Sequence, residues 1–275
     1  MSEIPSPFPA AVRKIGIAAP SKRPDPEQLR KALEMLKSTG VETVCAPDML
    51  AEGEEDYFAS DAETRANGFN ALLRDRSIDL ILCSRGGYGS GYLLDRIDWP
   101  LLAERNLPVC GYSDITALHM GMLAHHAGIP VTSPMAETLL RAGSDSFTSM
   151  QHAVGYALKL NDGSKMTARL TRVTEQMTDK VTGHFIAANL AVLTSLCGSK
   201  HLPRWTGAVL AVEDIDEEPR KIDRMLLQLD LCGIFDEVSA VVFGKFSGAC
   251  GTPEERDRIF RRFAARHPRT AFFKG

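Results

Sequence analysis

Hydrophobic positions in the first half of the chain follow two alternating patterns. Short runs of consecutive apolar residues, typical of buried strands, alternate with segments whose apolar residues have helical spacing, as at Leu29, Leu33 and Leu36. The predicted strands cover residues 14–19, 41–46, 78–83, 107–110 and 129–132, and the predicted helices cover residues 26–38, 61–74, 91–97 and 114–127. Strands that alternate with helices predict an α/β fold, with a parallel sheet covered by helices on both faces.

The pattern changes between about residues 140 and 182, where polar residues from Gly143 to Ser146 and the turn sequence Asn161-Asp162-Gly163 interrupt it. We therefore predict an N-terminal domain over residues 1–150, followed by a linker and a smaller C-terminal α/β domain over residues 151–275. The predicted helices of this second part cover residues 188–196, 220–231 and 253–266, and the predicted strands cover residues 208–212 and 240–243.

Composition and charge exclude several classes of protein. The hydrophobic share of 44% and the charged share of 24% are near globular averages, and a net charge of -3 gives no electrostatic footprint for nucleic acid. Because neither a signal peptide nor a membrane-length apolar run occurs, we expect a cytoplasmic protein that does not bind membranes. The six cysteines form no C-x-x-C pair, which favours buried reduced thiols over disulfides or metal ligands.

The segment Gly111-Tyr112-Ser113-Asp114 lies between a predicted strand and a predicted helix, the setting of a nucleophile elbow. A sharp turn at this point would expose Ser113, and the N–H of Asp114 could hold an oxyanion. The second glycine of the G-x-S-x-G pattern is missing, because Ile115 occupies its place. Taken alone, the tetrapeptide favours the more ordinary interpretation, in which Ser113 or Asp114 caps the helix.

A glycine-rich segment, Arg85 to Gly91, directly follows the predicted strand 78–83 and so lies at a carboxyl end of the sheet, where open α/β folds bind ligands. The N–H groups of Gly86 and Gly87 could bind an oxyanion or a carboxylate, and Arg85 could add a positive charge. The segment is not a dinucleotide fingerprint, since Tyr92 stands where a third glycine is needed. A tight turn that needs positive φ angles is the alternative.

An acidic run begins at Glu213, at the end of the predicted strand 208–212, and continues to Glu218. Glu213 is the acid closest to the sheet, and we expect the others to enter solvent. The spacing matches no calcium loop and no histidine is near, so no metal site is predicted.

Several segments, in this order and spacing, resemble the LD-carboxypeptidases, a family of serine peptidases also called muramoyltetrapeptide carboxypeptidases, which includes the microcin C immunity peptidases. The likeness spans nearly the whole chain. The segments are Ile17-Ala18-Ala19-Pro20-Ser21, Tyr57-Phe58-Ala59, Cys83 to Gly89, Gly111 to Thr116, Asn189-Leu190, Glu213-Asp214, Ile222-Asp223-Arg224 and Phe243-Gly244.

The resemblance implies a flavodoxin-like or Rossmann-like N-terminal domain, a smaller C-terminal α/β domain and a cleft between them. It implies Ser113 as the nucleophile and Glu213 as the acid of a Ser-His-Glu triad, without metal or organic cofactor and often in a homodimer. The N–H groups of Asp114 and of Gly86 or Gly87 would bind the oxyanion. Arg85 is our candidate for a substrate carboxylate.

The base of that triad is not found among the seven histidines. In the family it lies in a Gly-His segment after the last strand, and here the sequence stops at Gly275, as that strand begins. We therefore expect the catalytic histidine to lie beyond the 275 residues. His184 is near a glycine-rich segment of the family and is expected to line the cleft, and His267 is expected at a helix end.

Three functions follow from these predictions. The leading hypothesis is release of the C-terminal D-alanine from a cytoplasmic murein tetrapeptide during cell-wall recycling. The second is an immunity-type peptidase that hydrolyses an aminoacyl-nucleotide antibiotic, which is less favoured because neither Trp99 nor Trp205 lies in an obvious substrate loop. The third is a small-molecule binding protein without catalysis on the same scaffold.

Overall fold

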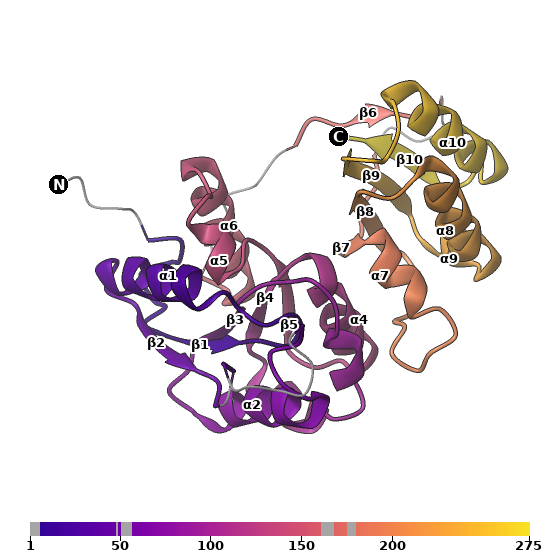
Figure 1. Ribbon diagram of the computed structural model, residues 1–275. Coiled ribbons are helices and arrows are strands. Elements are labelled where there is room, and N and C mark those ends of the chain that lie inside the picture. The colour runs from indigo at the N-terminus through magenta and orange to yellow at the C-terminus, as the bar shows by residue number, and fades with distance from the viewer. Residues whose placement is uncertain (1–5, 48, 51–56, 161–167, 175–179) are drawn as a thin grey trace. The chain divides into compact units, whose positions relative to one another are not determined.

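The computed structural model describes residues 6–47, 49–50, 57–160, 168–174 and 180–275. The chain forms two compact units, residues 1–166 and 167–275 (Figure 1). The boundary predicted at residue 150 falls within helix α6 (Ser144–Ala157), which belongs to the first unit. Phe147, Met150 and Val154, spaced along one face of α6, are buried, which explains why this helix stays with the first unit.

The first unit contains a five-stranded parallel sheet in the order β2-β1-β3-β4-β5. This is the flavodoxin-like order, and it confirms the predicted fold class. Figure 1 shows helices on both faces, with α1 on one and α2 on the other. The strands are β1 (Lys14–Ala18), β2 (Glu42–Cys45), β3 (Leu80–Cys83), β4 (Pro108–Gly111) and β5 (Ile129–Thr132). The other elements are α1 (Pro26–Ser38), α2 (Ala62–Arg74), η1 (Ser90–Leu93), α3 (Trp99–Arg105), η2 (Ser113–Ile115), α4 (Thr116–Ala124) and α5 (Ala136–Leu139).

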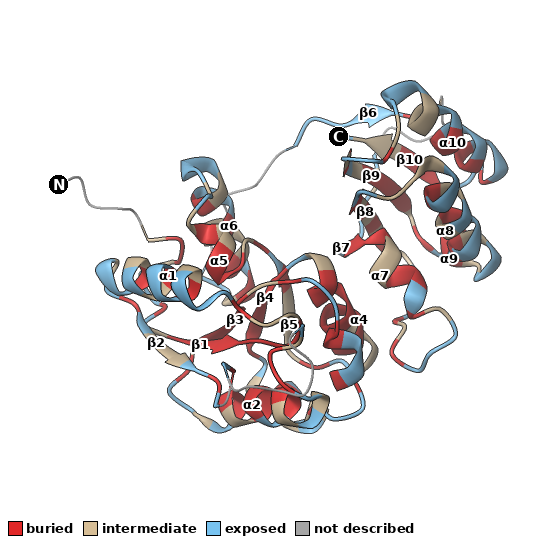
Figure 2. Cartoon of the chain, in the orientation of Figure 1, coloured by how far each residue is buried: buried red, intermediate tan, exposed pale blue. Residues whose placement is uncertain are grey.

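The core of this unit follows from its sequence pattern. Every residue of the central strands β3 and β4 is buried (Figure 2), as expected of parallel strands covered on both faces. Helices α1 and α2 begin where an aspartate caps the first turn: Asp25 accepts a hydrogen bond from Gln28 N at 2.9 Å, and Asp61 accepts one from Thr64 N at 2.8 Å.

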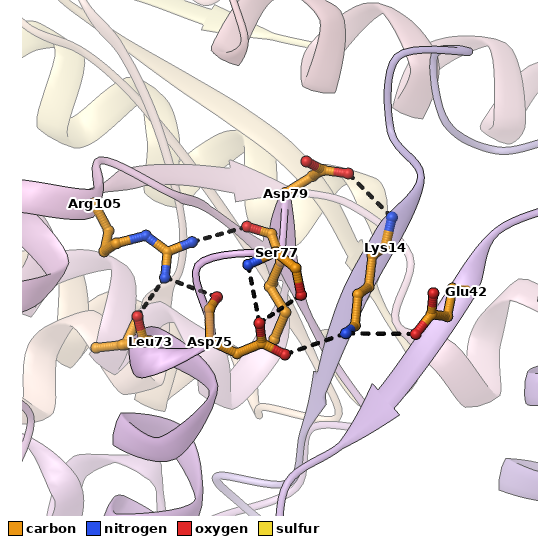
Figure 3. A network of polar contacts seen from close by, with 8 residues as sticks. Lys14, Glu42, Leu73, Asp75, Ser77, Asp79 and Arg105 are labelled. Atoms are coloured by element: carbon orange, nitrogen blue, oxygen red, sulfur yellow. Dashed lines mark hydrogen bonds and ion pairs between the residues drawn. The ribbon is translucent and has the colours of Figure 1, made fainter.

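A polar network joins the amino ends of β1 and β3 (Figure 3). Lys14 Nζ lies 3.3 Å from Asp75 Oδ2 and 3.4 Å from Glu42 Oε1, while Asp79 accepts a hydrogen bond from Lys14 N at 3.0 Å. Arg105 donates to the carbonyl oxygen of Asp75 at 2.9 Å. These contacts stabilise the sheet at the amino ends of its strands, away from the carboxyl ends.

The second unit contains a sheet in the order β6-β10-β9-β8-β7, parallel except for β6, which is antiparallel to β10. This is the predicted smaller α/β unit. Its strands are β6 (Thr171–Arg172), β7 (Phe185–Asn189), β8 (Val209–Ile215), β9 (Ala240–Ser247) and β10 (Ala271–Lys274). Its helices are α7 (Leu190–Ser195), α8 (Pro219–Leu231), α9 (Ile234–Glu237) and α10 (Pro253–Arg266).

Three predicted helices differ from the structure. The start of the predicted helix 188–196 is the end of β7, because Asn189 caps α7 by accepting from Val192 N at 3.1 Å. The predicted helix 91–97 is one 3-10 turn, η1, preceded by Gly89 with a φ of +121°. The predicted helix 114–127 is divided into η2 and α4, and the chain turns after α4 at His126, whose φ is +51°. Among the described residues, no helix is long and apolar enough to cross a membrane.

Candidate active site

Three loops meet at the carboxyl ends of neighbouring strands in the first unit. Ser21 follows β1, the glycine-rich segment follows β3, and Ser113 follows β4, and in the sheet β3 lies between β1 and β4. In an open α/β sheet, this edge beside the β1/β3 switch point is where ligands bind.

Ser113 occupies a sharp turn between β4 and the helical segment that follows. Its φ is +61°, a left-handed conformation that costs a residue other than glycine roughly 1–2 kcal/mol. A side chain at Gly111 would bring its Cβ within 2.8 Å of Ile115 Cγ1, so this glycine is needed for the turn to close. Neither Ser113 nor Asp114 caps a helix, since the residues that precede η2 and α4 are Tyr112 and Ile115. The structure thus has the geometry of a nucleophile elbow in place of the alternative N-cap.

The glycine-rich segment packs directly against the serine. A Cβ on Gly86 would lie 3.2 Å from both Cβ and Oγ of Ser113. Gly87 and Gly89 have φ angles of +119° and +121°, so positive φ explains these two glycines and close approach explains Gly86. Within the described part of the chain, the N–H groups of Gly86, Gly87 and Asp114 donate to no backbone or side-chain acceptor. They are therefore available to an oxyanion.

The side chain of Asp114 holds the three loops together. It is 4% exposed, and its Oδ2 accepts hydrogen bonds from Ser90 N at 2.8 Å and from the Ser21 hydroxyl. Its backbone oxygen accepts a further bond from the Ser90 hydroxyl. The carboxylate of Asp114 is thus committed to structure. Ser21 and Ser90, whose positions this network explains, were not predicted as site residues from the sequence.

Glu213 lies near the carboxyl end of β8 in the second unit, opposite Asn189 of β7. Asn189 Nδ2 lies 3.4 Å from Glu213 Oε1 and donates to Asp214 Oδ1 at 3.0 Å. The ladder between β8 and β9 is irregular at Glu213, where two residues of β9, Gly244 and Lys245, face one residue of β8. Burial raises the pKa of Glu213 above its ordinary value, and the neighbouring Asp214 adds to that effect. Glu213 is thus a partly buried carboxylate at a bulge. A bulge changes the direction in which a side chain points relative to a regular strand.

Models of known protein families match both units of the chain. Residues 15–133 match the LD-carboxypeptidase N-terminal domain, and residues 182–270 match the LD-carboxypeptidase C-terminal domain. A probable murein peptide carboxypeptidase of Bacillus subtilis (strain 168) is 30% identical over 251 residues, which are 90% of this chain and 77% of the relative. The chain belongs to the LD-carboxypeptidase family. This confirms the family predicted from the sequence.

Two further family members are similar along most of the chain. The crystal structure of muramoyltetrapeptide carboxypeptidase from Oxalobacter formigenes matches with a TM-score of 0.74 and 27% identity, over 95% of this chain and 87% of that one. The microcin C7 self-immunity protein of Escherichia coli is 26% identical over 241 residues, which are 78% of this chain and 69% of the relative. The family therefore includes both murein peptidases and an immunity protein.

The acids that follow Glu213 in this member of the family differ from one another in burial. Asp214 is 3% exposed and accepts hydrogen bonds from Ala191 N and Ile215 N, each at 2.9 Å. The prediction that all acids after Glu213 enter solvent is therefore wrong for Asp214. Its carboxylate holds the start of α7 against β8, a structural role that the sequence run Glu-Asp does not distinguish from that of Glu213.

Arg85 is half-buried beside the serine loop and forms an ion pair with Glu137, at 3.5 Å from NH1 to Oε2. Glu137 also accepts a hydrogen bond from Asp25 N at 2.9 Å, and burial raises its pKa. The buried Nε of Arg85 has no partner among the described residues. The guanidinium therefore has a fixed position, and the exposed part of the side chain, 29% of its surface, lies outside the buried Nε.

His119, His125 and His267 have structural contacts. His119 is buried 3.0 Å from Val109 O, and burial lowers its pKa to about 4. His267, at the end of α10 as predicted, lies between Asp230 and Asp236 at 2.8 and 3.1 Å, and His125 stacks on Trp99. His184, by contrast, is exposed. Among the described residues, no group of three or more histidines, cysteines or acids is arranged to hold a metal ion.

Proposed function

We propose that this chain is a serine-type LD-carboxypeptidase that releases the C-terminal D-alanine from cytoplasmic murein tetrapeptides during cell-wall recycling. The observation that carries the proposal is the position of Ser113, which is held at positive φ, with Gly86 packed against its Oγ and with free N–H groups beside it. A strained serine that caps no helix is typical of a nucleophile. The buried cysteines, Cys83, Cys110 and Cys250, are free thiols, which is consistent with the cytoplasm.

In the proposed reaction, Ser113 Oγ attacks the carbonyl carbon of the last peptide bond. A histidine accepts the hydroxyl proton and passes it to the leaving amine, so that D-alanine departs and an ester with Ser113 remains. A water molecule, deprotonated by the same histidine, then hydrolyses the ester. The N–H groups of Asp114 and of Gly86 or Gly87 stabilise the oxyanion of both tetrahedral intermediates.

Glu213 orients the histidine in this proposal. A carboxylate in a partly buried position interacts more strongly with an imidazolium than one in water does, so the burial of Glu213 suits a triad acid. Because His119 and His267 have structural partners, we assign neither of them as the base. The assignment of the base to a histidine comes from the family resemblance alone.

Arg85 is proposed to meet the free carboxylate that a carboxypeptidase must recognise. Its side chain is 29% exposed next to Gly86 in the sequence, and Glu137 fixes the guanidinium, which supports this role. A homodimer, which the resemblance also implies, remains a prediction that sedimentation can test.

The immunity-type activity is the second candidate, because the family includes a microcin C7 self-immunity protein. Such an enzyme would need an open aromatic face for the nucleobase. Trp205 is 2% exposed, and Trp99 is stacked on His125 at a centroid distance of 4.7 Å. Neither indole can therefore provide that face.

The proposal is tested by measuring D-alanine release from a muramoyl-tetrapeptide with the full-length protein and with Ser113→Ala. We expect the variant to lose on the order of 10⁴-fold or more in kcat, as for other serine nucleophiles. Ser38→Ala, at an exposed site on α1, is the matched control and should retain wild-type activity. Equal release by wild type and Ser113→Ala would refute the nucleophile. Cleavage of an aminoacyl sulfamoyl nucleoside alone would favour immunity, and binding without cleavage would favour the non-catalytic protein.

A further inference from the structure

Four of the five tyrosines in the chain are exposed and belong to the loops around Ser113. Tyr57, Tyr88 and Tyr92 are 41%, 55% and 52% exposed, and Tyr112, which directly precedes the serine, is 38% exposed. Large aromatic side chains that gather on a surface in this way mark binding sites more often than isolated ones do. We refer to Tyr57, Tyr88 and Tyr92 together as the tyrosine platform.

The platform is built around Phe58. The Phe58 ring centroid lies 5.4 Å from that of Tyr57, 5.9 Å from that of Tyr88 and 6.2 Å from that of Tyr92. The guanidinium of the buried Arg65 lies 4.9 Å from the Phe58 ring centroid and donates to the carbonyl oxygen of Gly89 at 3.0 Å. The three exposed rings therefore pack on Phe58, and Phe58 in turn contacts the buried guanidinium of Arg65.

The platform is joined to the nucleophile through the glycine-rich segment. A Cβ on Gly87 would lie 3.1 Å from the Tyr57 hydroxyl, and a Cβ on the adjacent Gly86 would lie 3.2 Å from Ser113 Oγ. Ser90, between Tyr88 and Tyr92 in the sequence, is bound to Asp114 at 2.8 Å. Since neighbouring Cα atoms are about 3.8 Å apart, the platform begins within roughly 13 Å of the serine.

The chemistry of the platform suits a sugar. The interplanar angles are 85° between Tyr57 and Phe58, 41° between Phe58 and Tyr88 and 78° between Tyr88 and Tyr92, so these rings form no parallel slot for a flat base. The hydroxyls of Tyr88 and Tyr92 lie 3.0 Å apart and can exchange their mutual hydrogen bond for one to a ligand. Ring faces that contact C–H groups, beside hydroxyls that bind polar groups, match a pyranose with an acetamido substituent.

We infer that the tyrosine platform binds the muramoyl sugar of the substrate, and this inference rests on the proposed function. In a muramoyl-tetrapeptide, three residues separate the sugar from the scissile carbonyl. At about 3.3–3.6 Å per extended residue, the sugar lies roughly 10 Å from that carbonyl, which is within the range that separates Ser113 from the platform. Binding at such a remote point stabilises the transition state and so selects sugar-bearing peptides over free ones.

The test compares kcat/KM for muramoyl-tetrapeptide and for the free tetrapeptide in the full-length protein. We expect wild type to prefer the muramoyl substrate and the double variant Tyr88→Leu/Tyr92→Leu to reduce that preference at least tenfold. Tyr88→Phe/Tyr92→Phe, which keeps the rings, should give a smaller reduction. Tyr156→Leu is the matched control, because Tyr156 is 78% exposed on α6 and makes none of these ring contacts.

The outcomes separate this inference from the proposed function. An unchanged preference in the double variant overturns the platform while D-alanine release still supports the peptidase. The inference is also overturned if the double variant loses kcat/KM only for an aminoacyl sulfamoyl nucleoside, since the platform would then bind a nucleobase. If wild type releases no D-alanine at all, calorimetric titration of the Ser113→Ala protein with muramoyl-tripeptide decides: binding weakened at least tenfold by the double variant supports the platform, and unchanged or absent binding refutes it.

Discussion

The serine turn of the first unit and the acid strand of the second unit hold their functional groups by different means. At the serine turn, backbone conformation and close packing fix the geometry. Ser113 has positive φ, and a Cβ at Gly86 would lie only 3.2 Å from Ser113 Oγ. On the acid strand, side-chain hydrogen bonds from Asn189 and the burial of Glu213 and Asp214 determine the environment.

The difference indicates which kind of substitution should affect each region. The serine turn is fixed mainly by sterics and therefore responds to added volume, while the buried carboxylate of Asp114 joins the loops around it. A group fixed by burial and hydrogen bonds tolerates small changes in volume but responds to any change in charge. Each prediction below perturbs one region in the way that should affect it and leave the other region intact.

The largest effect is expected from Glu213→Gln. The amide keeps the volume and the contact with Asn189 but removes the negative charge that stabilises an imidazolium, so kcat should fall on the order of 10³- to 10⁴-fold. Steady-state D-alanine release measures it. Glu217→Gln, in the same acidic run and paired with Lys221 at 3.4 Å, is the control and should lose less than twofold. Equal activity of Glu213→Gln and wild type would remove Glu213 from the triad.

A smaller loss is expected from Gly86→Ala. The new methyl group would press on Cβ and Oγ of Ser113, and a displacement of this kind should lower kcat/KM about 10- to 100-fold. Gly91→Ala is the matched control, because a Cβ at Gly91 meets no atom within 4 Å. Circular dichroism should show both variants folded. A loss of equal size in the two would mean that the effect is general to the loop and does not depend on contact with Ser113.

The smallest effect concerns stability and pH. Because burial raises the pKa of Glu213 in the folded state, ionising this carboxyl costs the folded protein free energy, and the cost sets in as pH rises from about 4.3, the ordinary value, through the raised pKa. Glu213→Gln removes that cost. Its free energy of unfolding relative to wild type should therefore increase as pH rises across this window and level off above it.

Urea unfolding of both proteins at several pH values between about 4 and 7 measures this difference. Glu217→Gln should show no such trend relative to wild type. A relative stability of Glu213→Gln that falls as pH rises would mean that the Glu213 carboxylate is stabilised in the folded protein, in contradiction to its burial.

The fold was largely predictable, because periodicity reports burial directly. The alternating strands and helices of the first unit, the helix Pro253–Arg266 and the setting of Ser113 could be found from apolar spacing alone. The run from Ala187 to Leu196 misled the prediction because it is apolar through both a strand and a helix. The signal that separates them is Asn189, a helix-capping residue type that ends β7 and begins α7.

Candidate site residues such as Ser113, Gly86 and Glu213 could be named from the sequence, but their geometry could not. The positive φ of Ser113 depends on how Gly111, Ile115 and Gly86 pack, and no local pattern encodes it. The different environments of Glu213 and Asp214 accompany a bulge in the strand pairing, which depends on a strand distant in sequence. The tyrosine platform likewise unites residues from separate loops, and only Tyr88 and Tyr92 have a spacing that the sequence could have suggested.

The central claim, that Ser113 is a nucleophile activated through Glu213, is tested most directly by a fluorophosphonate probe on the full-length protein, with the adduct located by peptide mass spectrometry. The account predicts one adduct on the peptide that contains Ser113, no adduct in Ser113→Ala and slow labelling in Glu213→Gln. Labelling of a different serine, or equal labelling rates in wild type and Glu213→Gln, would contradict it.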